Sequence, residues 1–318
     1  MRKIIQVFKK RPIWAILLLL VIIISIAAPE FLRIRNLLNI LLQSSVNGIM
    51  AVGMTYLMIN GFFDLSVGTV MGFSAALAVG LQPMGLFPAI LISLIIGAGI
   101  GAINGFFVAR AKINAFVVTL GSFIGVRGLI YIYTKEDALI GEIMGFSDFG
   151  ASSVLGIPTL FIIMIVIAII AEFVLRKTPH GRNTYAIGGN YEAAANAGIA
   201  VNKTIFINFV LCSLAAAIGG VLLASRMNAA TPGLGWPDQN LMIIATVVLG
   251  GTSLNGGYGS IVHTLGGVLT IGVIQNALNL LNVQSYYNML LMGIILILVV
   301  FADSRFKLAR EQKKKVEA

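Results

Sequence analysis

Four polar side chains lie inside stretches of the sequence that are otherwise apolar, and a fifth, Asp64, lies between two such stretches. The five are Asp64, Asn104, Arg127, Asn276 and Asn279. Polar and charged groups at membrane depth are costly, and they usually face the interior of a helix bundle or water. A carboxylate or an amide at such a position can form hydrogen bonds with the hydroxyl groups of a polar solute. These five residues are therefore the candidates for a solute path.

Each candidate also has a structural alternative. Asp64 can cap the helix that is expected to begin near Ser66 instead of contacting a solute. Arg127 can extend to the membrane surface, pair with an acidic residue outside, or line the path. The asparagines can form hydrogen bonds between helices. Asn276 and Asn279 are three residues apart and share a helix face, which makes them the better candidates for the path.

The residues that catalysis or metal binding would require are sparse or far apart. His180 and His263 are distant in the sequence, and Cys212 is the single cysteine, so we predict no metal site and no disulfide within the chain. There is no Gly-x-x-x-x-Gly-Lys-Ser/Thr phosphate loop. We also find no nucleophile–base motif and no paired carboxylates in one apolar stretch. The sequence therefore predicts no catalytic residue, no bound cofactor and no enzyme activity.

The segment 176–203 has the pattern of a short surface helix. Gly188 and Gly189 predict a flexible turn, and Asn190 is a favourable N-cap because its side-chain oxygen can accept a backbone N–H. Glu192 falls in the first turn, where the helix dipole favours an anion. A run of alanines propagates the helix, and Gly198 ends it. A helix with such small side chains fits a groove on another protein.

The elements that must position these residues are membrane helices. Hydrophobic residues make up 58% of the 318 residues and charged residues 11%, far from the composition of a soluble domain. A spanning helix needs roughly 20 residues, and lipid offers no partner for open backbone groups. We therefore expect an all-α polytopic protein with a single transmembrane domain over residues 1–318.

About ten spans are predicted, with eight or nine as alternatives, at 13–28, 38–59, 66–82, 86–108, 114–133, 157–175, 204–224, 239–254, 261–281 and 285–302. The third and eighth spans are short and border loops that could be re-entrant.

The positive charges predict the orientation of these spans. If the N-terminus lies inside, the inner segments hold 17 lysines and arginines and the outer segments hold four. Because basic residues favour the cytoplasmic side, both basic tails, 1–12 and 303–318, are expected in the cytoplasm together with the segment 176–203. The net charge of +10 comes from short basic clusters between apolar runs, which indicates a membrane rather than nucleic acid.

The outer segment 134–156 is acidic. Its acidic residues are Glu136, Asp137, Glu142 and Asp148. This segment could face a soluble partner, or it could be a loop that is merely solvated.

Glycines at four-residue spacing form a further pattern. Gly97, Gly101 and Gly105 would let helix backbones approach closely. Packing within the subunit is one interpretation, and a dimer interface is the other.

Several motifs together resemble one transporter family. Glu192-Ala193-Ala194 followed by Gly198-Ile199 resembles the EAA-type coupling loop of ABC importer permeases. The wider pattern resembles the ribose/monosaccharide-type ABC transporter permeases, a group of branched-chain and sugar inner-membrane translocators. Matching stretches elsewhere are 64–68, 101–112, 119–128, 248–260 and 276–280. The resemblance runs from about residue 36 to residue 302.

The resemblance implies the rest of the transport machine. It implies a second permease subunit, identical or different, cytoplasmic ABC ATPase subunits that use ATP and Mg, and a solute-binding protein outside the bacterial inner membrane. The solute would be a monosaccharide or a similar small polar molecule moved inward. The ATPase would be coupled through Gly188, Gly189, Asn190, Glu192, Ala193, Ala194, Gly198 and Ile199. Phe62-Phe63 stands where the family usually has Gly-Ile, so the identity of the sugar does not follow.

Two other classes of protein fit the sequence less well. A secondary transporter or channel would need acidic residues deep in its spans for coupling, and no predicted span has an acid near its middle. A membrane enzyme would need the catalytic groups that the sequence lacks. We also expect two inverted five-helix halves as one layout, because Gly61-x-x-Asp64 and Gly235-x-x-Asp238 each precede a short span.

Overall fold

A computed structural model describes residues 12–284 and positions 287, 290, 293, 294, 297 and 301, and most of these residues are helical. Its longer elements are α2 (Pro12–Ala27), α3 (Ile34–Ile59), α4 (Val67–Gly80), α5 (Leu86–Ala109), α6 (Ala115–Thr134), α8 (Thr159–Lys177), α9 (Pro179–Gly189), α11 (Val201–Met227), α12 (Gln239–Leu249) and α13 (Ile261–Leu280). Shorter elements are α7 (Met144–Ala151), α10 (Tyr191–Asn196) and the 3-10 turns η1 (Pro29–Leu32) and η2 (Gln82–Met84). Two-residue strands form two antiparallel pairs, β1 (Leu139–Ile140) with β4 (Ala229–Ala230), and β2 (Ser153–Val154) with β3 (Ile157–Pro158).

The helices fit an all-α polytopic membrane protein. Six of the described helices, α3, α5, α6, α8, α11 and α13, are long and apolar enough to cross a membrane. Three more, α2, α4 and α12, are apolar but shorter. These nine helices coincide with the first nine predicted spans. The tenth prediction, 285–302, lies mostly outside the described residues, as do most of the two basic tails, so the count of ten stays a prediction.

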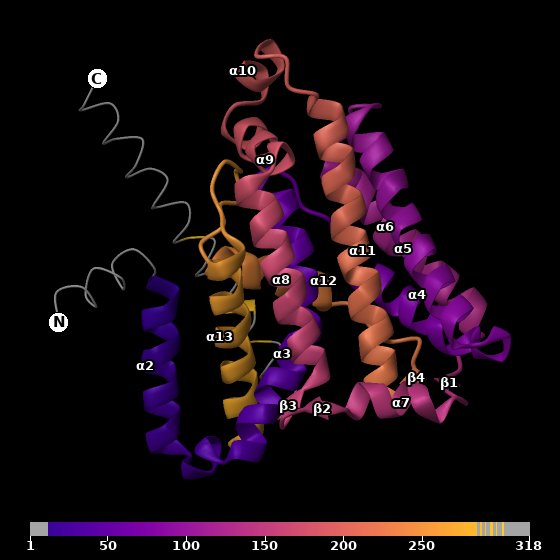
Figure 1. Ribbon diagram of the computed structural model, residues 1–318, viewed down its shortest axis with the longest axis vertical. Helices are drawn as coiled ribbons and strands as arrows, with labels where there is room; N and C mark the ends of the chain where they lie inside the picture. Colours follow the sequence, from indigo (N-terminus) through magenta and orange to yellow (C-terminus); the bar gives the residue numbers. More distant parts are fainter. Residues whose placement is uncertain are drawn as a thin grey trace.

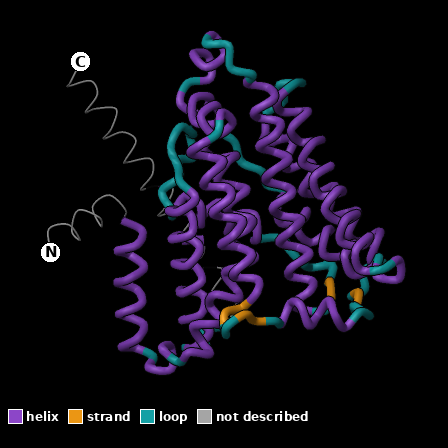
Figure 2. The backbone as a smooth tube through the Cα atoms, viewed as in Figure 1, coloured by secondary structure: helices purple, strands orange, loops and turns teal. Residues whose placement is uncertain are grey.

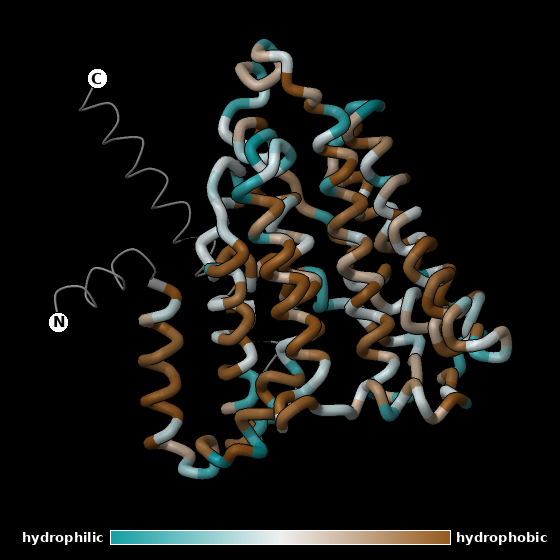
Figure 3. Tube along the Cα trace, in the orientation of Figure 1, coloured by the Kyte–Doolittle hydropathy of each residue, from teal (hydrophilic) through white to brown (hydrophobic). Residues whose placement is uncertain are grey.

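The two ends of the molecule differ. Helices α9 and α10 lie at one end, at the top of Figure 1, and α7 with the four short strands lies at the other. Figure 2 shows that strands occur only at the α7 end of the part that the structure describes. Along the helices between the two ends apolar residues dominate, and polar residues gather toward the ends (Figure 3). This distribution is the one expected for a protein that crosses a lipid bilayer.

Helices α4 and α12 are half-length and begin next to each other. With 14 and 11 residues, they are about 21 Å and 17 Å long at 1.5 Å per residue, which is less than the ~30 Å hydrocarbon core. Gly68, near the start of α4, lies against Gly235, and a Cβ at Gly68 would lie 3.4 Å from the backbone nitrogen of Asn240. The two glycines thus allow the beginnings of the two half-helices to meet inside the bundle.

Helix α11 lies at the centre of the bundle and packs against α3, α4 and α5. The predicted glycine stripe lies on its contact with α5: a Cβ at Gly101 would lie 2.6 Å from the Phe209 carbonyl oxygen and the Ser213 Cβ. Gly97 and Gly105 face α11 in the same way. Close packing within the subunit is therefore confirmed for all three glycines.

The acidic segment 134–156 is folded rather than merely solvated. It contains β1 and α7, and Phe146 of α7 is buried with 2% of its surface exposed. Ser225 at the end of α11 donates a hydrogen bond of 2.5 Å to the Phe146 carbonyl oxygen. The Gln82 side-chain oxygen accepts hydrogen bonds from the backbone nitrogens of Glu142 (2.7 Å) and Ile143 (3.0 Å). These contacts hold the segment across the α7 end of the bundle.

Candidate functional site

The segment 176–203 contains two consecutive helices, α9 and α10. Asn190 has extended backbone angles, and its Oδ1 accepts a hydrogen bond of 2.9 Å from the backbone nitrogen of Ala193, so it caps α10 as predicted. Glu192 is in the first turn of α10. Gly198 lies just after the end of α10 and has a φ of +79°. The side of α10 that carries Ala194 is buried. Most of the other residues from 191 to 198 are exposed, so α10 presents a small, accessible surface.

The prediction of a flexible turn at Gly188 and Gly189 is wrong. Both residues belong to the last turn of α9. A Cβ at Gly188 would overlap the carbonyl oxygen of Ile59 and would lie 2.5 Å from the backbone nitrogen of Gly257, whereas a Cβ at Gly189 would meet nothing within 4 Å. Gly188 is therefore a point of close backbone contact between α9, the end of α3 and the loop that follows α12.

Lys112 holds α10 to the loop between α5 and α6. Its Nζ donates hydrogen bonds of 2.7 Å to the Tyr191 hydroxyl and of 2.7 Å to Oδ1 of Asn202. The ammonium also lies 5.3 Å from the centroid of the Tyr191 ring. The sequence predicts Lys112 as a cytoplasmic positive charge within the family-like stretch 101–112, but not its partners. Its partners lie 79 and 90 residues away, so no local pattern could have identified the contact.

A cavity of about 470 Å³ lies beside this contact. It is bounded by the α3–α4 connection, the α5–α6 loop, α10 and the start of α11. Its wall includes Phe62, Phe63, Phe116, Lys112 and Tyr191. The two aromatic residues that replace the family's usual Gly-Ile thus line a space next to the predicted coupling helix.

Asp64 and Asn104 are brought together in a buried polar cluster. Neither side chain is exposed. Asp64 accepts hydrogen bonds from the backbone nitrogen (2.7 Å) and the hydroxyl (2.6 Å) of Ser66, and longer ones of 3.5 Å from Asn104 Nδ2 and the Ser213 hydroxyl. Ser122 donates to Oδ1 of Asn104. The Asp64 carboxylate accepts the backbone N–H of Ser66, the residue that immediately precedes α4. This geometry favours the capping alternative over direct contact with a solute.

A second buried cluster joins α9 to the end of α3 and to the first part of α11. Asn208 donates hydrogen bonds of 3.1 Å to Oδ1 of Asn60 and of 3.2 Å to the Thr184 hydroxyl, and Nε2 of His180 lies 2.8 Å from Oδ1 of Asn208. The sequence predicts no metal at His180, but its amide partners are too distant in the chain to be predicted. Buried amides of this kind orient the helices that carry them.

Arg127 is buried, with 8% of its surface exposed, so it does not extend to the membrane surface. Its guanidinium donates to the Pro232 carbonyl oxygen and to the Tyr131 hydroxyl, the latter at 2.7 Å. It also lies over the rings of Tyr131 (4.4 Å) and Trp236 (5.1 Å). These contacts fasten α6 to the segment that leads into α12.

Asn276 and Asn279 have different surroundings although they are three residues apart. Asn276 forms a reciprocal amide pair with Asn36 of α3, with hydrogen bonds of 2.7 Å and 2.9 Å. Asn279 is exposed in the single chain. This pair lies near the start of α3, away from the Asp64 cluster beyond its end. The geometry favours the alternative in which Asn276 joins two helices.

Known proteins share most of this sequence. The model of the family "Branched-chain amino acid transport system / permease component" matches residues 36–300. The ribose import permease protein RbsC of Bacillus subtilis (strain 168) is 43% identical over 293 residues, which cover 91% of each chain. RbsC of Escherichia coli (strain K12) is 41% identical over 296 residues, covering 91% of this chain and 92% of that protein. The L-arabinose transport system permease protein AraH of Escherichia coli (strain K12) is 38% identical over 296 residues, covering 89% and 86%. No solved structure matches the chain significantly.

The family match runs from the start of α3 past the end of α13, and RbsC of Bacillus subtilis covers 91% of the chain. The chain therefore belongs to this family of permease components, and it is a multi-pass membrane permease subunit rather than an enzyme.

Proposed function

We propose that this permease is the membrane subunit of an ATP-driven importer that moves a monosaccharide inward across the bacterial inner membrane. The observation that carries the proposal is the similarity to ribose import permeases, at 41–43% identity over 91% of this chain. An L-arabinose permease is similar over nearly the same length. Ribose and arabinose are both pentoses, so a pentose is the first candidate for the solute.

The α10 end of the molecule is proposed to face the cytoplasm. The distribution of 17 inner and four outer basic residues supports this orientation. It places both tails, 1–12 and 303–318, and the segment 176–203 on the cytoplasmic side of a single transmembrane domain. ATP and Mg would then be used by separate ATPase subunits, and this chain would bind no cofactor.

The exposed helix α10 is proposed as the contact with those ATPase subunits. Its capped start at Asn190, the anion Glu192 and the small residues of the EAA pattern give it a defined shape with little side-chain bulk. The proposed coupling residues are Gly188, Gly189, Asn190, Glu192, Ala193, Ala194, Gly198 and Ile199. The close contact at Gly188 supports its inclusion, because it ties α9 to the end of α3 and to the loop after α12.

Further partners are proposed at the opposite end. The acidic segment 134–156 is folded across the α7 end, where a solute-binding protein would approach from outside. A second permease subunit, identical or different, would complete the transporter. Ten spans in two inverted halves are also proposed. Support comes from α4 and α12, which are both short and whose beginnings lie close together, with Gly68 of α4 against Gly235 of the segment that leads into α12.

The solute path is proposed to pass near the meeting point of these half-helices. The buried side-chain oxygen of Asn240, at the second residue of α12, forms no hydrogen bond among the described residues. Of the predicted path residues, Asp64 and Asn104 lie in the same half of the bundle as the cavity beside α10. Arg127, Asn276 and Asn279 are proposed to act on the path through the helices that they position or border.

Uptake by the complete importer tests the choice of solute. The permease, its ATPase and its binding protein would be offered labelled ribose, arabinose, galactose, a nucleoside and leucine separately. We expect ATP-dependent uptake of one sugar, most readily a pentose. Uptake of leucine with no uptake of any sugar would instead support an amino-acid permease, the activity in the family's description.

The substitution Glu192→Lys tests the coupling surface. Reversal of this charge puts a cation in the first turn of α10, where the helix dipole disfavours it. We expect at least a fivefold loss of ATP-driven uptake with a normal amount of permease in the membrane. Glu192→Asp keeps the anion and is the matched control. Normal uptake by Glu192→Lys would contradict a coupling role for α10.

A further inference from the structure

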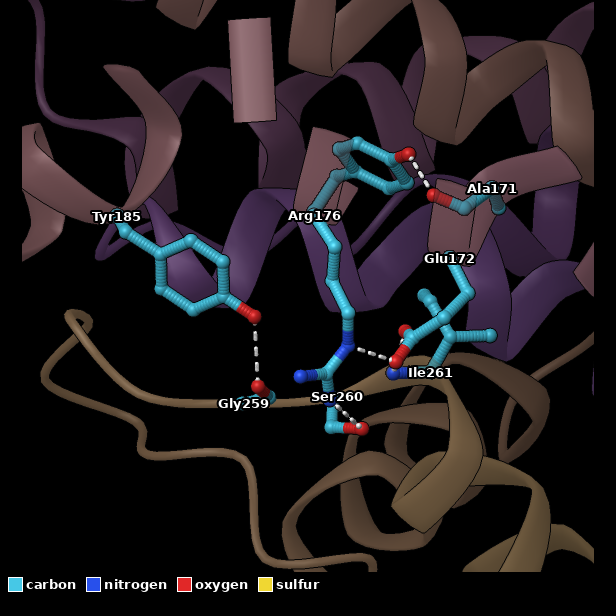
Figure 4. Close-up of polar contacts among 8 residues, drawn as sticks. Ala171, Glu172, Arg176, Tyr185, Gly259, Ser260 and Ile261 are labelled. Carbon is cyan, nitrogen blue, oxygen red and sulfur yellow. Dashed lines mark hydrogen bonds and ion pairs between the residues drawn. The ribbon is translucent and has the colours of Figure 1, made fainter. Parts of the chain in front are cut away.

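The end of α8, helix α9 and the start of α13 meet at the α10 end of the molecule. Figure 4 shows the polar side chains that join them, with Glu172 and Arg176 on α8, Tyr185 on α9, and the segment 259–261 that leads into α13. None of these residues is among the site residues predicted from the sequence. The contacts are specific in geometry, and each can be removed by a conservative substitution.

Glu172 ties α8 to the first residue of α13. Its Oε2 accepts a hydrogen bond of 3.1 Å from the backbone nitrogen of Ile261, and its Oε1 forms an ion pair with Arg176. Arg176 in turn donates a hydrogen bond of 3.3 Å to the Ser260 hydroxyl. The first N–H groups of a helix have no partner within it, and the helix dipole favours an anion there. Glu172 therefore acts as an N-terminal cap for α13 that comes from another helix.

Tyr185 ties α9 to the same segment. Its hydroxyl donates a hydrogen bond of 2.8 Å to the carbonyl oxygen of Gly259. Burial, together with the charge of Glu172, raises the pKa of the Tyr185 hydroxyl above its ordinary value of 10.0, so it remains a donor at neutral pH. The contact lies two residues before the one that Glu172 makes with Ile261.

Backbone contacts reinforce these side-chain contacts. The Gly257 backbone nitrogen donates a hydrogen bond of 2.8 Å to the Ile59 carbonyl oxygen. A Cβ at Gly256 would lie 2.9 Å from the Gly188 carbonyl oxygen. Helix α9 thus lies in direct contact with the α12–α13 loop up to the residues that immediately precede the cap of α10.

We infer that the end of α8, helix α9 and the start of α13 move as one body, with Glu172 and Tyr185 as positioning residues that carry a displacement of α10 to α13. The warrant is a continuous set of direct contacts rather than spatial proximity alone. Helix α13 packs along α3, α12 and α2, so a shift of its start would reach the half-helix α12. This inference rests on the proposed role of α10 as the ATPase contact.

Hydrogen exchange on the purified permease tests the tether independently of transport. In Glu172→Ala and Tyr185→Phe, we expect the amides of residues 259–264 to exchange at least threefold faster than in the unaltered protein. The matched control is Tyr133→Phe, because the Tyr133 hydroxyl has no hydrogen bond shown among the described residues and lies on α6. Unchanged exchange in both variants would overturn the tether whatever the function of the protein.

The number of solute molecules moved per ATP hydrolysed tests the consequence. In the complete importer, Glu172→Ala and Tyr185→Phe should lower this ratio at least threefold at an unchanged amount of assembled complex, with Glu172→Gln less affected because an acceptor for Ile261 remains. A wild-type ratio in both variants would overturn the inference. Failure of the unaltered complex to move any solute with ATP would refute the proposed function instead, and the exchange experiment would still decide the tether.

The charge swap Glu172→Arg with Arg176→Glu separates the two parts of the contact. It restores an ion pair on α8 but places a cation at position 172, which cannot accept a hydrogen bond from Ile261. We expect the ratio to stay low and the amides of residues 259–264 to exchange rapidly. Full restoration of both would show that the ion pair alone matters, and it would overturn the role assigned to the cap.

Discussion

Gly188 is the residue at which the backbone leaves least room. A methyl group there would overlap the Ile59 carbonyl oxygen and press on the backbone of Gly257. Because neither obstacle is a flexible side chain, we expect Gly188→Ala to cost about 1–3 kcal/mol. Thermal unfolding of the purified permease in detergent would show this as a lower Tm.

Gly189→Ala is the matched control for that substitution. A Cβ at Gly189 meets nothing within 4 Å, and alanine favours the helical conformation that the residue adopts at the end of α9. Its Tm should equal or exceed that of the unaltered protein. Equal losses in both variants would mean that the contact with Ile59 is not what position 188 requires.

The Asn36–Asn276 pair offers a second test at the residue scale. Asn276→Leu leaves the Asn36 amide without its partner inside the bundle, which should cost about 1–3 kcal/mol. The double variant Asn36→Leu with Asn276→Leu removes both amides and should lose less stability than the sum of the two single variants. Strict additivity of the changes measured by denaturation would contradict a direct pair.

What the sequence could predict at this scale depends on the distance between partners along the chain. The cap formed by Asn190 was predictable because its partner, Ala193, is three residues away. The contact between Lys112 and Tyr191 was not, because a pattern within a short window holds no information about a partner 79 residues distant. The contact of Gly188 with Ile59 could not be predicted for the same reason, and the local pattern around Gly188 predicts a turn instead.

At the scale of elements, α10 depends on its surroundings for its structure. A helix of six residues is too short to be stable alone in water. Asn190→Ala removes its cap and should cost about 1 kcal/mol locally. We expect faster hydrogen exchange over residues 191–197 and reduced ATP-driven uptake.

Asn190→Asp is the control at that position, because aspartate is an equally good N-cap. It should keep both slow exchange and uptake. Loss of uptake in Asn190→Asp with unchanged exchange would mean that the amide itself, rather than the helix it caps, contacts the partner.

The half-helices show how far composition predicts elements. The spans 66–82 and 239–254 stood out because they are short and border glycine-rich loops. The structure gives α4 and α12 at these positions, with Gly68 of α4 in contact with Gly235 of the segment that leads into α12. Length and hydropathy could predict two short apolar helices, but not that their beginnings lie close together, since that depends on contacts between segments that are far apart in the chain.

At the scale of the whole molecule, one end of the bundle carries an exposed short helix and a cavity, and the other end is covered by a folded segment. The exposed α10, the cavity beside it and the tether to α13 all lie at the same end. The acidic segment with α7 covers the other end. This polarity is what a permease would need if ATPase subunits act on one face of the membrane and the solute arrives from the other.

Uptake of labelled sugar into proteoliposomes that contain the permease, its ATPase and its binding protein tests this account most directly. We predict uptake that requires ATP and all three components and that stops when the ATPase carries an inactivating substitution. Uptake by the permease alone, driven by an ion gradient and indifferent to ATP, would contradict the account and make the protein a secondary carrier.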